Sequence, residues 1–159
     1  MVNKYKKEII INPYVKGEDL SEEQSLQFGT VSKQFQNVNP TTDHWLSSGS
    51  GVSGIPFVFV VTKKYASVEI SINRGEKEVN EKIFDQLYLK KEEIEKTFGE
   101  DLFWERLDER KSCRISSRLE DVNIVNVADW KKIKDFQCDA MPRLDKALRT
   151  VVQKVVKEV

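Results

Sequence analysis

Two runs of β-branched and aromatic residues lie close together near the middle of the chain. Residues 57–61 are apolar throughout, and residues 66–72 alternate between apolar and polar positions. A short polar turn at 63–65 separates the runs, which is typical of a β-hairpin. Because successive side chains of a strand point to opposite faces, we expect the first arm to be covered on both faces. We expect the second arm to lie nearer an edge of the sheet, with Ser67, Glu69 and Ser71 on its solvated face.

Apolar residues recur at helical spacing on both sides of this hairpin. A capping box at 21–24 predicts a short helix that ends before Pro40. After the hairpin, Asn73 followed by Glu76 is a helix-start signal, and we expect one long helix over 76–98 that Gly99 terminates. The buried stripe predicted for that helix consists of Val79, Ile83, Leu87 and Ile94, flanked by Phe84, Tyr88 and Phe98.

A second hairpin and a last helix complete the pattern. Residues 102–107 and 112–119 form the arms of the second hairpin, and a cap at Asn126 precedes a helix whose apolar positions continue to Val155. Pro142 interrupts that helix, so we expect a kink or two helices meeting near it.

The order of the elements predicts the fold class. Tight turns between strands favour an antiparallel sheet, so we expect an α+β fold in which two β-hairpins form the sheet and helices pack on it. The order is helix, hairpin, helix, hairpin, helix. The length of 159 residues fits a single domain over 1–159, in which residues 1–20 form a loosely attached arm.

A glycine-rich segment at 47–54 precedes the first hairpin. Gly49, Gly51 and Gly54 match the letters GxGxxG, but the dinucleotide motif needs a strand before it and a helix after it. Here a loop is expected before it and a strand after it. The segment is therefore interpreted as a flexible connection or a sharp turn, and no nucleotide cofactor is expected.

Charge and cysteine content narrow the function classes. The 26 basic and 26 acidic residues cancel, so any binding to nucleic acid depends on a local patch rather than on net charge. Cys113 and Cys138 lack the spacing of a metal site or a disulfide framework. No apolar run is long enough to span a membrane, and no signal peptide is recognisable, so we expect a cytoplasmic protein without a membrane partner.

Short motifs follow one another in a fixed order along most of the chain. They are 43–45, 48–54, 66–75, 83–87, 91–95, 98–107, 113–115, 129–130 and 139–141. This ordered series, over about residues 40–150, resembles the bacterial and archaeal domain-of-unknown-function family 4268. The resemblance implies a protein that stands alone or follows a nuclease-like domain, and hence a role in DNA metabolism or defence. Pro142 departs from the family pattern, which continues as a helix there.

The residues do not indicate a catalytic centre. A restriction-type nuclease site needs an acid followed by Glu-x-Lys, and Glu69 is followed by Ile70 and Ser71. His44 has no evident nucleophile beside it, which favours a surface or capping role. We therefore expect no catalytic residue, no metal and no cofactor.

Arginine and tryptophan residues near the hairpins give the one positive indication of a function, which is binding to nucleic acid. Arginines can contact phosphates while a tryptophan stacks on a base. The alternative is that the arginines pair with Glu105 and Asp108 and that the tryptophans lie in the core. The candidate nucleic-acid-binding residues are Trp45, Arg74, Arg114 and Arg118.

Three functional hypotheses remain open. The first is a non-catalytic accessory module that contacts nucleic acid or a nuclease-like protein through these arginines and the basic last helix, 143–159. The second is a protein-partner or self-association domain that uses the apolar tail at 151–156. The third is a divergent metal-dependent nuclease-like enzyme with a site near His44, Trp45 and Glu69.

Overall fold

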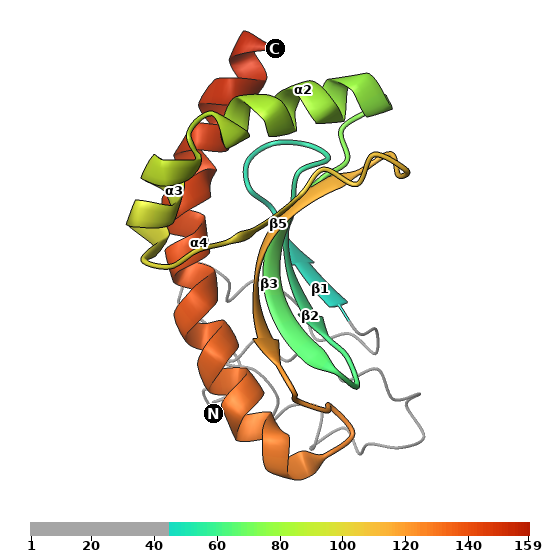
Figure 1. Cartoon of the computed structure of the whole chain (residues 1–159), viewed down its shortest axis with the longest axis vertical. Coiled ribbons are helices and arrows are strands. Elements are labelled where there is room, and N and C mark those ends of the chain that lie inside the picture. Colours follow the sequence, from blue (N-terminus) through green and yellow to red (C-terminus); the bar gives the residue numbers. More distant parts are fainter. Residues whose placement is uncertain (1–44) are drawn as a thin grey trace, which may run out of the picture. The chain divides into compact units, whose positions relative to one another are not determined.

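The computed structural model describes residues 45–159 (Figure 1). Side chains are described from Ser47 onward. The predicted arm at 1–20, the predicted helix at 21–38 and His44 lie outside the described residues.

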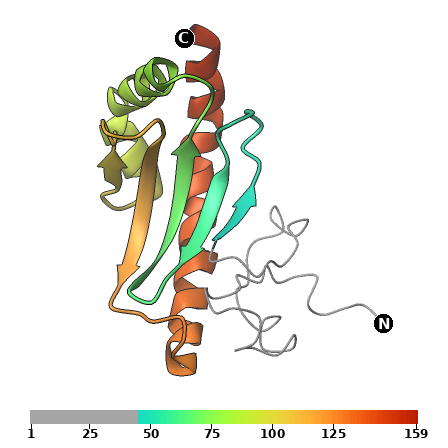
Figure 2. The ribbon, with the colours of Figure 1, turned by 90° about the vertical axis from the view of Figure 1, so that its right-hand side faces the viewer.

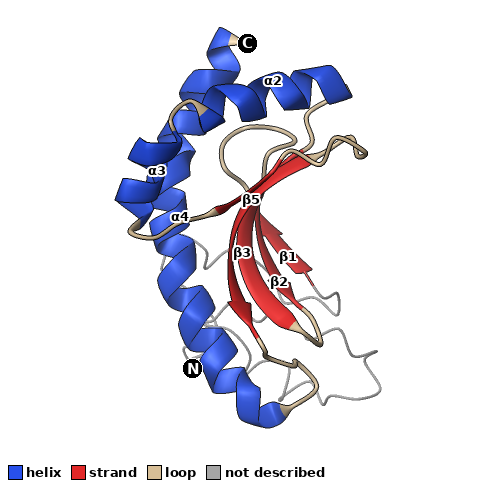
Figure 3. Ribbon diagram, viewed as in Figure 1, coloured by secondary structure: helices blue, strands red, loops and turns tan. Residues whose placement is uncertain are grey.

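The described elements form an α+β fold with one five-stranded antiparallel sheet, which confirms the predicted class (Figures 2 and 3). The order of the strands is β1-β2-β3-β5-β4. The strands are β1 (Trp45–Ser48), β2 (Phe57–Val61), β3 (Tyr65–Ile72), β4 (Phe103–Glu105) and β5 (Cys113–Glu120). The helices are α2 (Lys77–Tyr88), α3 (Lys91–Phe98), the 3₁₀ turn η3 (Val127–Asp129) and α4 (Trp130–Glu158).

The predicted hairpin is present as β2 and β3, but the predicted place of its second arm is wrong. β3 lies in the middle of the strand order, between β2 and β5. Ser67 is fully buried and Glu69 is 9% exposed, although both were expected on a solvated face. Alternation of apolar and polar residues identifies two faces of a strand, but it does not distinguish a solvated face from one whose polar groups are covered and hydrogen-bonded.

The described residues form two compact units. The first holds residues 45–48, Val58–Val68 and Arg118–Pro142. In this unit the start of α4 is tied to the hairpin, because Gln137 Nε2 donates to the carbonyl oxygens of Val60 (3.0 Å) and Ser67 (3.2 Å). Trp130 Nε1 also donates to Ile124 O at 2.7 Å. The hydrogen bonds fix which face of α4 meets the strands.

The second unit holds Gly49–Phe57, Glu69–Ser117 and Arg143–Val159. Here the predicted helix over 76–98 is two helices, α2 and α3, separated at Leu89 and Lys90. Leu89 is 77% exposed, whereas Ile94 and Phe98 are buried. Apolar spacing continues across the break, so periodicity alone predicts one helix. Gly99 ends α3 in the left-handed conformation (φ 100°), as predicted.

The start of α2 also differs from the prediction. Glu76, not Asn73, is its N-cap residue. The nearby backbone N–H of Arg74 is satisfied from within the helix instead, because Asn80 Oδ1 accepts it at 2.7 Å. Asn80 is fully buried and its Nδ2 donates to Lys111 O at 3.0 Å. This one side chain therefore joins the turn after β3 to the turn before β5.

The second hairpin is present as predicted, with β4 and β5 antiparallel and Glu105 opposite Arg114. Trp104 contacts the α2 aromatics, with its ring centroid 6.0 Å from that of Phe84 and 5.5 Å from that of Tyr88. Tyr88 is 49% exposed, so it forms the rim of this cluster rather than part of the predicted buried stripe.

α4 is a single helix of 29 residues that contains Pro142, so of the two predicted alternatives the pair of separate helices is wrong, and a kink at Pro142 stays a prediction. Proline inside a helix costs about 3 kcal/mol through the lost hydrogen bond and the steric clash. Met141 and Leu144 on either side of it are fully buried, and their packing offsets that cost. The predicted cap residue Asn126 caps η3 instead, accepting a hydrogen bond from Ala128 N.

Candidate nucleic-acid interface

The structure gives the four predicted site residues different surroundings. Trp45 is the first residue of β1, and its side chain lies outside the described part of the chain. Arg74 is exposed in the turn after β3. Arg114 and Arg118 are half-buried on β5 and fall in different compact units.

Arg114 forms the cross-strand ion pair that the alternative interpretation predicts. Its Nε donates to Glu105 Oε2 at 2.6 Å and its NH2 donates to Glu105 Oε1 at 3.2 Å. The other proposed partner, Asp108, pairs with Arg106 at 2.6 Å. The charge of Arg114 is thus offset by a carboxylate within its own hairpin.

Arg118 lies in the first unit with an aromatic neighbour. Its guanidinium carbon is 5.0 Å from the ring centroid of Tyr65. A guanidinium over an aromatic face gains about 0.5–1 kcal/mol at partly exposed sites. This contact holds the side chain against β3 and makes it less available to a ligand.

Arg74 lines a pocket of about 400 Å³ in the second unit. Three segments meet there: the loop after β1, the turn after β3 and the last turns of α4. Counting only residues 45–159, the lining contains two cationic side chains and no carboxylate. Its residues are Gly51, Val52, Ser53, Arg74, Gln153, Val156 and Lys157.

The close approach of two backbones builds one wall of this pocket. Residues 49–56, which we call the glycine loop, extend the β2–β3 pairing, since Asn73 N donates to Gly54 O at 2.9 Å. Gly54 has φ +79°, and a Cβ there would lie 2.9 Å from Arg74 Cα. Only glycine adopts this conformation and leaves that space free. Gly54 therefore determines where the backbone of Arg74 lies relative to the loop.

The glycine loop is a hydrogen-bonded turn, which agrees with the sharp turn among the two predicted alternatives. The hydroxyl of Ser50 donates to Ile55 O, and Ile55 N donates to Val52 O at 3.2 Å. The strand β1 precedes the loop, contrary to expectation, and the strand β2 follows it. The loop therefore lacks the following helix that a dinucleotide motif requires.

Within the described part of the chain, no neighbouring side chain neutralises the cations of the pocket. Among residues 45–159, neither the Arg74 nor the Lys157 side chain has a hydrogen bond or an ion pair. In the same range the loop N–H groups of Gly51 and Ser53 have no partner either. The lining thus presents positive charge and hydrogen-bond donors together, the combination that binds phosphate groups.

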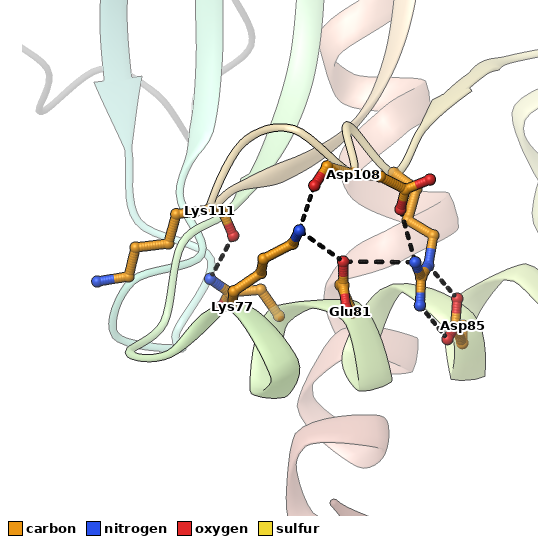
Figure 4. Close-up of polar contacts among 7 residues, drawn as sticks. Lys77, Glu81, Asp85, Asp108 and Lys111 are labelled. Atoms are coloured by element: carbon orange, nitrogen blue, oxygen red, sulfur yellow. Dashed lines mark hydrogen bonds and ion pairs between the residues drawn. The ribbon is translucent and has the colours of Figure 1, made fainter.

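A different group of charged residues is satisfied internally and joins α2 to the β4–β5 turn (Figure 4). Arg106 donates through Nε and NH2 to the two carboxylate oxygens of Asp85, at 3.0 and 3.1 Å. The bonds to Asp85 and then Asp108 raise the pKa of Arg106 further above its ordinary value. Lys77 lies 3.6 Å from Glu81 and donates to Asp108 O. These side chains stabilise the unit and leave little charge for a ligand.

The structure gives little support to a metal-dependent site near Glu69. Glu69 is buried within β3 rather than solvated as expected, and His44 lies outside the described residues. In the described part of the chain, no group of three or more His, Cys, Asp or Glu side chains is arranged to hold a metal ion. In addition, none of the helices within 45–159 has the length and apolar character needed to cross a bilayer.

Sequence reasoning missed two of the polar residues in the pocket, Ser53 and Gln153. Lys157 was counted only as part of a basic segment. A partial signal was present, because glycines at alternating positions favour positive φ and close backbone contacts. The contact between Gln153 and the loop spans about a hundred residues, and no local pattern indicates such a pair.

Comparison with known proteins gives one assignment. No match was found among curated proteins or among solved structures. The profile of one family matches residues 19–152, which is more than half of the chain and includes the glycine loop and Arg74. The chain therefore belongs to the family described as Domain of unknown function (DUF4268).

Proposed function

We propose that this protein is a non-catalytic accessory module that binds nucleic acid, and that the pocket of Arg74 and Lys157 contacts the phosphate backbone. The observation that carries the proposal is the charge of this pocket, which has two cationic side chains without partners in the described chain and no carboxylate in its lining.

The distribution of charge supports a local contact. With 26 basic and 26 acidic residues, the chain has no net field to attract a polyanion. Arg106, Arg114 and Arg149 are each paired with carboxylates. Arg74 is left as an exposed arginine beside a concave surface. Phosphate contacts of this kind fix position on a nucleic acid without reading its sequence.

The apolar tail gives less support to self-association. Val152 and Val155 are buried in the fold, at 0% and 1% exposure, and the flanking Val151 and Val156 are half-buried. Most of the apolar surface that motivated the hypothesis is therefore used inside the chain. A nuclease-like protein remains the proposed protein partner, supported by the family resemblance. A cytoplasmic location is also proposed, supported by the free thiol of Cys113.

A binding titration tests this proposal. Fluorescence anisotropy with labelled duplex and single-stranded DNA is expected to show binding at low salt that weakens as salt rises. The double variant Arg74→Ala/Lys157→Ala is expected to bind at least tenfold more weakly. The control Lys132→Ala removes an exposed cation of α4 outside the pocket and is expected to bind like the native chain. Native-like binding by the double variant would exclude the pocket.

A further inference from the structure

We infer that Gln153 is a positioning residue that holds the glycine loop in the conformation that binds the phosphate. This inference rests on the proposed function of the pocket. Gln153 carries no charge, so it would act on the ligand through the loop rather than as a counterion.

The contact between Gln153 and the loop is direct and tight. Gln153 Nε2 donates to Ser50 O at 3.0 Å, and the residue also lines the pocket. Gly51, the next residue of the loop, has φ +87°, and a Cβ on it would lie 2.6 Å from Gln153 Nε2. The absence of a side chain at Gly51 is therefore what lets the amide of Gln153 reach the loop backbone.

A second side chain of α4 holds the preceding carbonyl. Arg149 NH2 donates to Gly49 O at 3.2 Å. Arg149 is itself fixed by Asp145, at 2.6 Å, and lies 5.4 Å from the ring centroid of Phe57. Residues four apart share one face of a helix, so Arg149 and Gln153 reach the same side of α4 and hold consecutive loop carbonyls.

The two anchors fix the loop without using the N–H groups of Gly51 and Ser53. Arg149 and Gln153 donate hydrogen bonds to the carbonyl oxygens of the loop. The N–H groups of Gly51 and Ser53 have no partner in the described chain. A loop already held in its binding conformation does not lose that freedom when the ligand binds, which raises affinity. Releasing the loop would weaken binding without changing the number of phosphate contacts.

The test compares two measured quantities, the affinity for DNA and the dependence of that affinity on salt. The variants Gln153→Ala and Gln153→Met both remove the amide donor, and the second keeps most of the side-chain volume. We expect each to bind DNA about three- to tenfold more weakly, the effect of one lost hydrogen bond. The slope of log K against log salt is expected to stay at the native value, whereas Arg74→Ala lowers its magnitude by about 0.9. Thr150→Ala, an exposed neutral change on the same helix, serves as the matched control.

Hydrogen exchange provides a readout that needs no ligand. The backbone amides of Val52 and Ile55, which bond within the loop, are expected to exchange faster in both Gln153 variants than in the Thr150→Ala control. Unchanged exchange and affinity would overturn the inference, as would a loss of slope equal to that of Arg74→Ala. If the native chain bound no DNA, the proposed function would fail, and faster exchange would still show that Gln153 holds the loop.

Discussion

Arg114 and Glu105 are direct register partners across β4 and β5, and two hydrogen bonds of 2.6 and 3.2 Å join their side chains. Each side chain is 26% exposed, so solvent screens the pair only in part. We expect a double-mutant cycle with Arg114→Ala and Glu105→Ala to give a coupling energy of about 0.5–1 kcal/mol. Urea unfolding of the two single variants and the double variant measures it. Strict additivity would mean that the pair adds nothing to stability.

The same pair leads to a prediction about binding. Because Glu105 already offsets the charge of Arg114, we expect Arg114→Ala to leave the salt dependence of DNA binding close to native. A loss of slope as large as that of Arg74→Ala would identify Arg114 as a phosphate contact, as the sequence predicts.

Gly54 is expected to tolerate no side chain. Gly54→Ala forces a left-handed conformation on alanine and places Cβ 2.9 Å from Arg74 Cα and from Asn73 O. We expect a loss of stability of at least about 1–2 kcal/mol. Gly49→Ala is the matched control, since a Cβ there meets no atom within 4 Å. Differential scanning calorimetry is expected to give a lower melting temperature for Gly54→Ala than for Gly49→Ala. Equal melting temperatures would contradict the role given to Gly54.

Cys113 is expected to make stability depend on pH in the alkaline range. Burial, and to a smaller extent the charge of Glu81, raises the pKa of its thiol from the ordinary 9.0 to about 11. Between these two values the unfolded chain loses the proton while the folded chain keeps it. The contribution is therefore fully present below about pH 9 and is lost as the pH rises toward 11. The test is to measure the free energy of unfolding of the native chain and of Cys113→Ser across this pH range. If the two free energies changed with pH in parallel, the predicted contribution of Cys113 would be contradicted.

Pro142 is expected to reduce the stability of α4. Since the helix continues through it, Pro142→Ala would restore one backbone hydrogen bond and remove a clash. We expect a gain of about 1–3 kcal/mol in the free energy of unfolding. Thr150→Ala, on the exposed face of the same helix, is expected to change it by only a few tenths. A Pro142→Ala variant less stable than the native chain would show that proline packing outweighs the backbone cost.

The sequence predicts which strands and helices this fold contains better than it predicts which of them lie side by side. β2 and β3 are evident because β-branched residues and a polar turn are local features. The central place of β3 depends on its pairing with β5, about fifty residues further along the chain, which no local pattern encodes. The break at Leu89 is missed because the apolar spacing continues through it.

The candidate site shows the same division. Arg74 is a candidate already in the sequence, because an arginine after a strand is a simple signal. Within residues 45–159, the lining of its pocket contains no carboxylate. Arg114 is equally conspicuous in the sequence, yet its pairing with Glu105 depends on the register of the hairpin. Gln153 is missed because its contact with the loop requires the fold to bring α4 there. Charge patterns therefore identify candidates, and tertiary contacts decide which of them stay available.

The salt dependence of DNA binding by the Arg74→Ala variant tests the central claim most directly. If Arg74 contacts a phosphate, its loss lowers the magnitude of the slope of log K against log salt by about 0.9 relative to the native chain. A native slope in Arg74→Ala, at an affinity equal to that of the native chain, would contradict the proposal that this pocket binds nucleic acid.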